Sequence, residues 1–254
     1  MTNNSNQSSV KDLPLTRILP NTLTILALCS GLTGVRFALQ EKWEYAVLAI
    51  LAAAVFDVLD GGFARMLKTS SKFGAELDSL SDAISFGVAP VFILYLWTLQ
   101  YDTHLGWLAV LVFAVCMTLR LARFNTMLED TNIPLWKKRF FTGVPAPAGA
   151  SLALLPMALF FQWGDDVIAP HFSYYSIWVL VIGMLLISRI PTLALKGWRV
   201  ESIWRAYILV GLGAFISGLI TNPWLTISCA GILYIILIPV SWLLYKRMEK
   251  NEAR

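Results

Sequence analysis

The stretch FDVLDGGFARMLKTSSKFGAELDSLSD, residues 56–82, places four aspartates in a chain that is otherwise largely apolar. Asp57 and Asp60 are three residues apart, and Asp78 and Asp82 are four apart, so each pair shares one face of a helix. The connection between the pairs is short, which predicts two antiparallel neighbouring helices whose aspartates face one another. Four carboxylates brought together in this way repel strongly unless cations bind between them.

The composition around this stretch is that of a membrane protein. Of the 254 residues, 57% are hydrophobic and 14% are charged, against about 25% charged in an average soluble protein. Apolar stretches of about 20 residues, the length that a helix needs to cross a bilayer, recur along the chain. We therefore predict an all-α, polytopic membrane helical bundle without a separate soluble domain, surrounded by membrane lipids and not bound to nucleic acid.

The apolar stretches predict eight transmembrane helices. Glycine and proline in FGVAP, residues 86–90, are expected to kink or break the third helix. Pro145, Pro147 and Gly149 are expected to break the fifth near its start. The helices are expected near residues 18–38, 44–67, 73–100, 104–128, 144–163, 173–191, 203–221 and 224–246.

Basic residues gather in alternate connections between these helices, and therefore at one end of the helix bundle. The third, fifth and seventh connections contain no lysine or arginine. By the positive-inside rule, both termini and the aspartates therefore face the cytoplasm. The basic residues that mark the cytoplasmic side are Arg65, Lys68, Lys72, Arg123, Lys137, Lys138, Arg139, Lys196, Arg199, Arg205, Lys246, Arg247, Lys250 and Arg254.

The aspartates are candidate metal ligands. Oxygen-only ligands suit hard divalent ions such as Mg²⁺ or Mn²⁺, with phosphate oxygens completing the coordination. Two such ions a few ångströms apart would clamp a phosphoryl group for in-line displacement. An ion path in a cation transporter is the alternative of another class, but the acidic residues cluster once, near one membrane face, with no second copy in the chain.

Small residues accompany the aspartates. Gly61, Gly62 and Ala64 follow Asp60, and Gly74 stands one turn before Asp78. Small residues allow membrane helices to pack closely. They also leave room for a flat, polar ligand beside the metals, and the two interpretations stay open at the level of sequence.

The spacing of these residues resembles the signature of the CDP-alcohol phosphotransferases. The resemblance implies an integral membrane enzyme with a six-helix core and two divalent metal ions, Mg²⁺ or Mn²⁺, that displaces CMP from a CDP-linked lipid with an alcohol. The matching pattern is Asp57-x2-Asp60-Gly61-x2-Ala64-Arg65-x8-Gly74-x3-Asp78-x3-Asp82.

Roles for the individual residues follow from this resemblance. All four aspartates would be metal ligands, and Asp82 would also be the catalytic base that deprotonates the attacking hydroxyl. The residues that would contact the cytidine diphosphate lipid are Gly61, Ala64, Arg65, Gly74 and, in the first helix, Asn21 of LPNTLT.

Softer motifs resemble the phosphatidylserine synthase branch. They are SDAISFGVAP at residues 81–90, LRLARFN at 119–125 and FTGVPAPAGA at 141–150. The branch implies that CDP-diacylglycerol and L-serine give phosphatidylserine and CMP; choline, inositol phosphate or glycerol 3-phosphate are the alternative acceptors. It also implies a homodimer in a bacterial inner membrane. The chain would then divide into a polar tail (1–17), a six-helix catalytic core (18–191), an additional helix pair (192–246) and a second polar tail (247–254).

Two arginines are candidate ligands for the serine carboxylate. Arginine offers a fixed, forked cation that suits a carboxylate. Arg120 and Arg123 lie at the cytoplasmic end of the fourth predicted helix, at about the depth of the aspartates. Ordinary anchoring of that helix end by positive charge is the alternative explanation for both.

Overall fold

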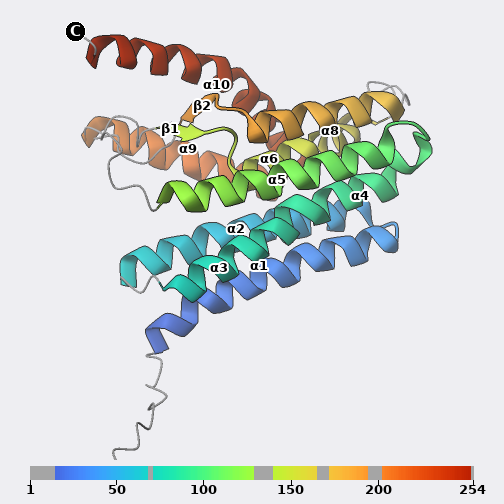
Figure 1. The fold of residues 1–254 in the computed structure, drawn as a ribbon, viewed down its shortest axis with the longest axis horizontal. Coiled ribbons are helices and arrows are strands. Elements are labelled where there is room, and N and C mark those ends of the chain that lie inside the picture. The colour runs from blue at the N-terminus through green and yellow to red at the C-terminus, as the bar shows by residue number, and fades with distance from the viewer. Residues whose placement is uncertain (1–14, 68–70, 129–139, 165–171, 194–201, 253–254) are drawn as a thin grey trace, which may run out of the picture.

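The computed structural model describes residues 15–67, 71–128, 140–164, 172–193 and 202–252, and the regular structure in these ranges is helical apart from two three-residue strands (Figure 1). Within these ranges five helices are long and apolar enough to cross a membrane, and there are six spans if one bent pair of helices is counted as a single span. The chain is therefore an all-α integral membrane protein. The predicted polar tail at residues 1–17 lies almost entirely outside the described residues.

The first two spans form a hairpin. Helix α1 (Leu15–Leu39) and helix α2 (Trp43–Leu67) pack against each other along much of their length. Glu41, in the tight connection, has a positive φ of 59°. This hairpin brings the end of α2 that carries the first two aspartates beside the start of α1.

The third span is continuous, so of the predicted kink or break at residues 86–90 the break is wrong, and the helix is instead distorted there into a π-helical segment. Helix α3 (Lys72–Asp82) passes into a π-helical segment, η1 (Ala83–Val88), and then into α4 (Ala89–Trp97). The N–H of Ala89 donates to the carbonyl of Ile84, five residues earlier. The wider π turn accommodates Pro90, which has no N–H and whose ring would crowd the carbonyl of residue 86 in a regular α-helix.

The fifth span is bent, but later than expected. Helix α6 (Ala146–Ala153) begins directly after Pro145 and contains Pro147 in its first turn, where a missing N–H costs nothing. The bend of 42° comes at Leu154, before helix α7 (Leu155–Trp163), which has Pro156 near its own start. Proline therefore acts here as a helix starter at both positions.

Asp102 organises the far end of the third and fourth spans, after the short 3₁₀ segment η2 (Leu99–Tyr101). Its carboxylate accepts hydrogen bonds from the Ser176 hydroxyl (2.7 Å) and from the N–H groups of Leu105 (3.1 Å) and His104 (3.2 Å). These bonds, that of Ser176 above all, hold the pKa of Asp102 below its ordinary value. Asp102 thereby joins the start of α5 (Gly106–Leu128) to α8 (Phe172–Ile187).

A short pair of strands follows the other ends of α5 and α8. Strand β1 (Phe140–Thr142) and strand β2 (Pro191–Leu193) are antiparallel, with Phe141 opposite Thr192. Gly143 leaves β1 with φ +79°, and a Cβ there would lie 2.6 Å from the carbonyl oxygen of Leu186. Only glycine fits this position without strain.

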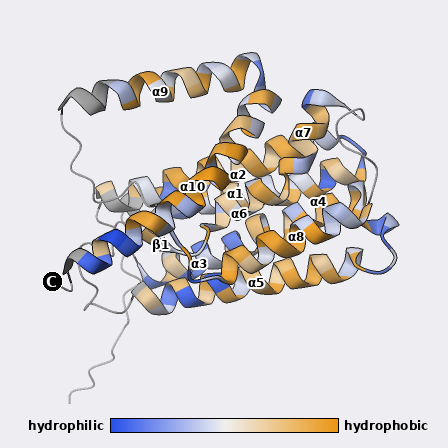
Figure 2. Cartoon of the chain, turned by 90° about the horizontal axis from the view of Figure 1, so that it is seen from above, coloured by the Kyte–Doolittle hydropathy of each residue, from blue (hydrophilic) through white to orange (hydrophobic). Residues whose placement is uncertain are grey.

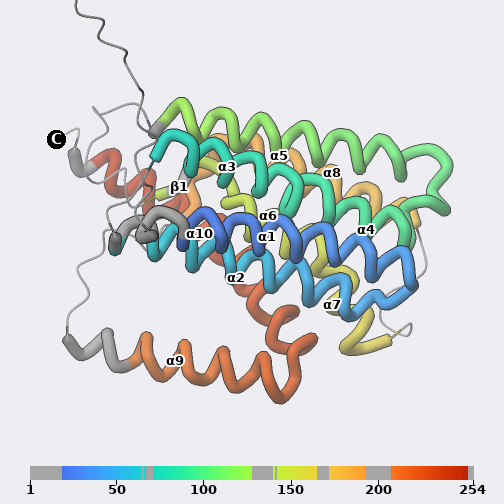
Figure 3. The backbone as a smooth tube through the Cα atoms, turned by 90° about the horizontal axis from the view of Figure 1, so that it is seen from below, coloured from blue at the N-terminus to red at the C-terminus, as the bar shows by residue number. Residues whose placement is uncertain are grey.

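The last two helices differ in how they pack. Helix α10 (Pro223–Glu252) contacts α7 and β2, whereas α9 (Ser202–Thr221) has α10 as its main partner. Figures 2 and 3 show α9 set apart from the rest of the bundle. The eight helical segments thus lie where the sequence predicts them, although α8 and the apolar part of α9 (Tyr207–Thr221) are short for a full span.

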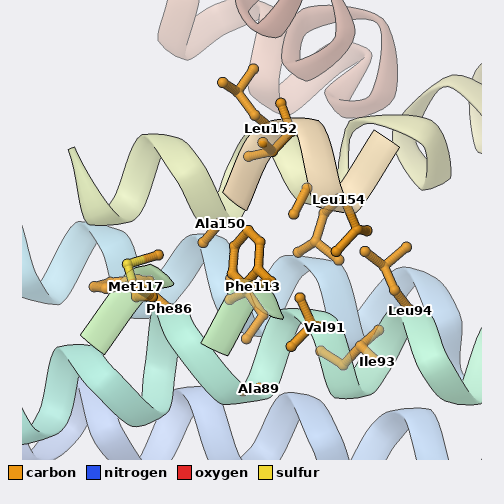
Figure 4. Packing of buried hydrophobic residues seen from close by; sticks show 14 of the residues in the cluster. Phe86, Ala89, Val91, Ile93, Leu94, Phe113, Met117, Ala150, Leu152 and Leu154 are labelled. Carbon is orange, nitrogen blue, oxygen red and sulfur yellow. The ribbon is translucent and has the colours of Figure 1, made fainter. Parts of the chain in front are cut away.

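The apolar core lies where η1, α4, α5 and α6 meet (Figure 4). Phe86, Phe113 and Met117 are fully buried there. A Cβ on Gly87 would stand only 3.1 Å from Cγ of Met117, so η1 and α5 are in close contact. Close packing of this kind supplies the van der Waals contacts that hold helices together in lipid, and it fixes the height of α3 in the bundle.

Candidate active site

Three carboxylates form a compact group at one end of the bundle. Asp57 and Asp60 come from α2 and Asp78 from α3, and one carboxylate oxygen of each lies within 4.8 Å of the others. Asp60 is buried, with 5% of its surface exposed, and the other two are half-buried. Oxygen donors of this kind suit a hard divalent cation, which would also remove the repulsion among them. The group can therefore hold a metal ion.

Asp82 lies one helical turn beyond Asp78, at the last residue of α3. It is half-buried and interacts electrostatically with Asp57 and Asp78, but its carboxylate is not part of the 4.8 Å group. The four predicted ligands are thus neighbours, with Asp82 displaced along α3 from the other three.

Thr24 of α1 holds the most buried aspartate in place. Its hydroxyl donates to Oδ2 of Asp60 at 2.6 Å and lies 3.1 Å from the carbonyl oxygen of Pro20. A neutral donor to a charged carboxylate makes a strong hydrogen bond. Sequence reasoning did not single out Thr24, because nothing in a chain read linearly relates it to a carboxylate 36 residues away.

Two serines fasten the third span to α1. Ser81 donates to the carbonyl of Thr24 (3.1 Å) and Ser85 to the carbonyl of Ala27 (3.2 Å). Gly31 allows this contact, because a Cβ at that position would lie 2.9 Å from the backbone of Ser85. The register of α1, α2 and α3 around the aspartates is therefore set by specific polar contacts as well as by packing.

The glycines of the signature divide into two kinds. A Cβ added at Gly61 or Gly62 would meet nothing within 4 Å, whereas one at Gly74 would lie 3.1 Å from Oδ1 of Asn21 and 3.2 Å from Oγ of Ser71. Helix packing therefore accounts for Gly74 but not for Gly61 and Gly62, which border open space next to Asp60. The side chains of Ala64 and Arg65 lie outside the described residues.

The two predicted acceptor-binding arginines have different surroundings. Arg120 is buried, with 9% of its surface exposed, and it interacts electrostatically with Asp82 and Asp57. Arg123 donates from Nη1 to the carbonyl of Ile187 (2.9 Å) and from Nη2 to that of Ser188 (3.2 Å). The guanidinium of Arg123 is thus engaged with the end of α8, and that of Arg120 lies close enough to the aspartates to interact with them electrostatically.

Asn125 adds a further polar contact between α5 and α3. Its Nδ2 donates to Oγ of Ser79 at 2.8 Å, and that hydroxyl donates to the carbonyl of Ala75. Ser79 directly follows Asp78, so α5 and α3 are joined beside the acidic group. Figure 2 shows that hydrophilic residues gather at this end of the bundle, around α3 and the ends of α5 and α10.

Comparison with known proteins extends over most of the chain. Residues 17–196 match the family described as CDP-alcohol phosphatidyltransferase, and residues 204–239 match CDP-alcohol phosphatidyltransferase 2. A CDP-diacylglycerol–serine O-phosphatidyltransferase of Mycobacterium leprae is 42% identical over 223 residues, which cover 88% of this chain and 74% of the relative. The proteins of the same name from Helicobacter pylori (30% over 233 residues, 89% and 91%) and Methanocaldococcus jannaschii (36% over 168 residues, 66% and 70%) are also similar.

Proposed function

The chain belongs to the CDP-alcohol phosphatidyltransferase family, and from this premise we propose that it transfers the phosphatidyl group of CDP-diacylglycerol to L-serine, giving phosphatidylserine and CMP. The observation that carries the proposal is the group of three carboxylates in a membrane bundle, in a chain whose relatives are named for this reaction. Family membership also argues against a cation transporter.

The acidic group is the proposed metal site. Asp57, Asp60 and Asp78, together with Asp82, would hold two divalent ions, Mg²⁺ or Mn²⁺. Such ions supply positive charge that neutralises a diphosphate and its leaving group. The donor set fits them, because it offers carboxylate oxygens and no softer ligand among the described residues.

In this proposal the side chains of the protein bind the nucleotide lipid and deprotonate the hydroxyl of serine. Asp82 takes the proton of the serine hydroxyl as the oxygen attacks the phosphorus bonded to diacylglycerol. The new phosphorus–oxygen bond forms while the bond to CMP breaks, in a single displacement without a covalent enzyme intermediate. Gly61 borders the nucleotide in this proposal, an assignment that the open space beside it supports. Asn21, Gly74, Ala64 and Arg65 are assigned to the nucleotide by the resemblance alone.

Arg120 is the proposed partner of the serine carboxylate. Its burial beside Asp82 supports this role, because a carboxylate held there keeps the hydroxyl of the same small molecule close to the base. The two backbone bonds of Arg123 favour a structural role for that residue, which would help the acceptor site only by holding α8 in place.

The wider organisation follows the same proposal. The resemblance to bacterial proteins supports a place in a bacterial inner membrane, and the distribution of basic residues supports termini and an active site that face the cytoplasm. Residues 18–191 form the catalytic core and residues 192–246 an additional helix pair. A homodimer is expected from the family resemblance.

The direct test is the release of CMP by purified protein in detergent. CDP-diacylglycerol is supplied with Mg²⁺ or Mn²⁺, and serine, choline, inositol phosphate and glycerol 3-phosphate are offered singly. We expect release with serine alone, abolished by EDTA and by Asp82→Asn, and retained in Glu76→Gln, which makes the same change at an exposed position of α3. Release with another alcohol alone would refute serine as the acceptor, and metal-independent release would refute the metal site.

A further inference from the structure

Two buried polar atoms near the acidic group have no hydrogen-bond partner. Among the described side chains, the buried polar atoms in this condition are Nε of Arg120, the hydroxyl of Tyr234 and Oγ of Ser228. Buried polar groups in folded proteins are nearly always paired, so an unpaired one calls for an explanation. Arg120 and Tyr234 invite a common explanation, because they belong to different helices and interact with each other electrostatically.

Tyr234 reaches this place from the C-terminal part of the chain. It lies on α10, within the second matched segment (residues 204–239), and its ring packs against the apolar core. Helix α10 contacts β2, and Figure 1 shows the two strands between α10 and α5, the helix that carries Arg120. The strand pair thus brings a side chain more than 100 residues distant in sequence to the arginine that interacts electrostatically with Asp82.

Strand β2 does not supply the Tyr234 hydroxyl with a hydrogen-bond partner of good geometry. Thr192 of β2 is close enough to the Tyr234 hydroxyl to interact with it, but the contact lacks the geometry of a hydrogen bond. The Thr192 hydroxyl instead donates to the carbonyl of Gly143 at 2.8 Å. Because the contact with Thr192 lacks hydrogen-bond geometry, the Tyr234 hydroxyl can still donate its proton to a ligand.

The side chains of Arg120 and Tyr234 together offer hydrogen-bond donors that suit a negatively charged ligand. A guanidinium offers only N–H donors, and a phenol offers an O–H donor. A carboxylate is the complement of such a pair, because it has about four lone-pair positions and accepts charge-assisted hydrogen bonds. In free serine the carboxylate and the hydroxyl stand on adjacent carbons. A carboxylate bound here therefore keeps the hydroxyl near Asp82, with which Arg120 interacts.

We propose that Tyr234 of α10 completes the acceptor site by donating its hydroxyl to the carboxylate of serine, beside Arg120. The inference rests on the proposed function and extends it, because it makes the C-terminal helix part of the site that chooses the acceptor. An amino-acid acceptor is then distinguished from an uncharged alcohol by two donors from two separate parts of the chain.

The test compares Tyr234→Phe with the wild type in steady-state CMP release, using L-serine and its methyl ester, which lacks the anionic carboxylate. We expect the KM for serine to rise about 10- to 100-fold, as the loss of a hydrogen bond to a charged group implies. The KM for CDP-diacylglycerol should stay within about twofold, a change too small to reflect a lost hydrogen bond, and the ester reaction should be unaffected. Tyr207→Phe removes the same atom from an exposed tyrosine of α9 and is expected to change neither constant.

Other results would overturn the inference in distinguishable ways. An unchanged KM for serine would exclude Tyr234 from the acceptor site, and a raised KM for CDP-diacylglycerol would assign the phenol to the nucleotide lipid. Equal losses for serine and its ester, or a Tyr234→Phe protein that does not fold, would mean that the hydroxyl serves the fold. A wild type that releases no CMP with serine would refute the proposed function itself, and the inference with it.

Discussion

Asp60 is set apart from the other aspartates because its carboxylate is both buried and hydrogen-bonded to another helix. The Thr24 hydroxyl gives its proton to Oδ2, which leaves the remaining lone pairs of the carboxylate for a cation. A ligand oriented by an outer partner binds metal more tightly than a free one. Thr24 is therefore a positioning residue of the proposed metal site.

Thr24→Val keeps the shape of the side chain and removes this donor. We expect CMP release to fall about 10- to 100-fold at low Mg²⁺, the range reported for loss of an outer-shell partner, and to recover in part as the Mg²⁺ concentration is raised. The measurement is a titration of activity against Mg²⁺. Thr24→Ser retains the hydroxyl and should follow the wild-type curve; a Thr24→Val protein with wild-type metal dependence would refute the positioning role.

Gly61 allows the packing and ligand interpretations of the small residues to be separated. A Cβ there meets nothing, so Gly61→Ala should fold and gain stability, by up to about 1 kcal/mol from helix propensity. We nevertheless expect it to raise the KM for CDP-diacylglycerol, because the methyl group enters the space assigned to the nucleotide. Both thermal unfolding in detergent and the KM are measured.

Gly31→Ala is the matched control for that change. Its methyl group would collide with the backbone of Ser85, so it should lower the thermal midpoint. If Gly61→Ala leaves the KM for CDP-diacylglycerol unchanged, the open space beside Asp60 does not hold the nucleotide.

At the scale of elements, the third span shows how a proline can be kept within a membrane helix. A sharp break would leave backbone groups unpaired in lipid, where each costs several kcal/mol. The π segment instead shifts the hydrogen bonds by one residue, from Ala89 back to Ile84. Because the helix stays continuous, the burial of Phe86 in the core also fixes where Asp82, one turn earlier in the same span, lies in the bundle.

Arg123 stabilises the end of α8. The last carbonyls of a helix lack intrahelical donors and carry partial negative charge, and Arg123 donates to those of Ile187 and Ser188. We expect Arg123→Gln to lower the free energy of unfolding by about 1–3 kcal/mol, with a KM for serine close to that of the wild type. Arg120→Gln should show the reverse pattern, and a large KM effect of Arg123→Gln on serine would place Arg123 in the acceptor site.

In the whole molecule, the two C-terminal helices differ in how closely they pack against the other helices. Helix α10 packs closely on α7, since a Cβ on Gly231 would lie 2.8 Å from Cδ1 of Leu155. Helix α9 stands apart (Figure 3), and a Cβ added at Gly213 on it would meet nothing within 4 Å outside its own helix. Of the added helix pair, α10 is therefore the member that is integral to the bundle.

Gly231→Val and Gly213→Val test this difference with one chemical change on each helix. Overpacking against Leu155 should destabilise the protein by about 1–3 kcal/mol and, by displacing Tyr234, raise the KM for serine. Gly213→Val should leave both the thermal midpoint and the KM unchanged. Equal behaviour of the two variants would contradict the assignment of α10 to the bundle.

The positions of the helices and the pairing of the acidic residues follow from local features of the chain. A bilayer requires about 20 apolar residues per span, so the eight segments can be located from the chain alone. Spacings of three and four residues place Asp57 with Asp60 and Asp78 with Asp82 on shared helix faces for geometric reasons. Both follow from the local geometry of a helix and the thickness of a membrane.

The contacts between groups that are distant in the chain depend on how the helices pack in the folded protein. The bond from Thr24 to Asp60, the engagement of Arg123 with α8 and the approach of Tyr234 to Arg120 join residues 36 to more than 100 positions apart. Helical periodicity states which face a residue occupies but not which helix covers that face. That choice depends on close contacts such as Gly31 with Ser85, which exist only once the whole bundle is packed.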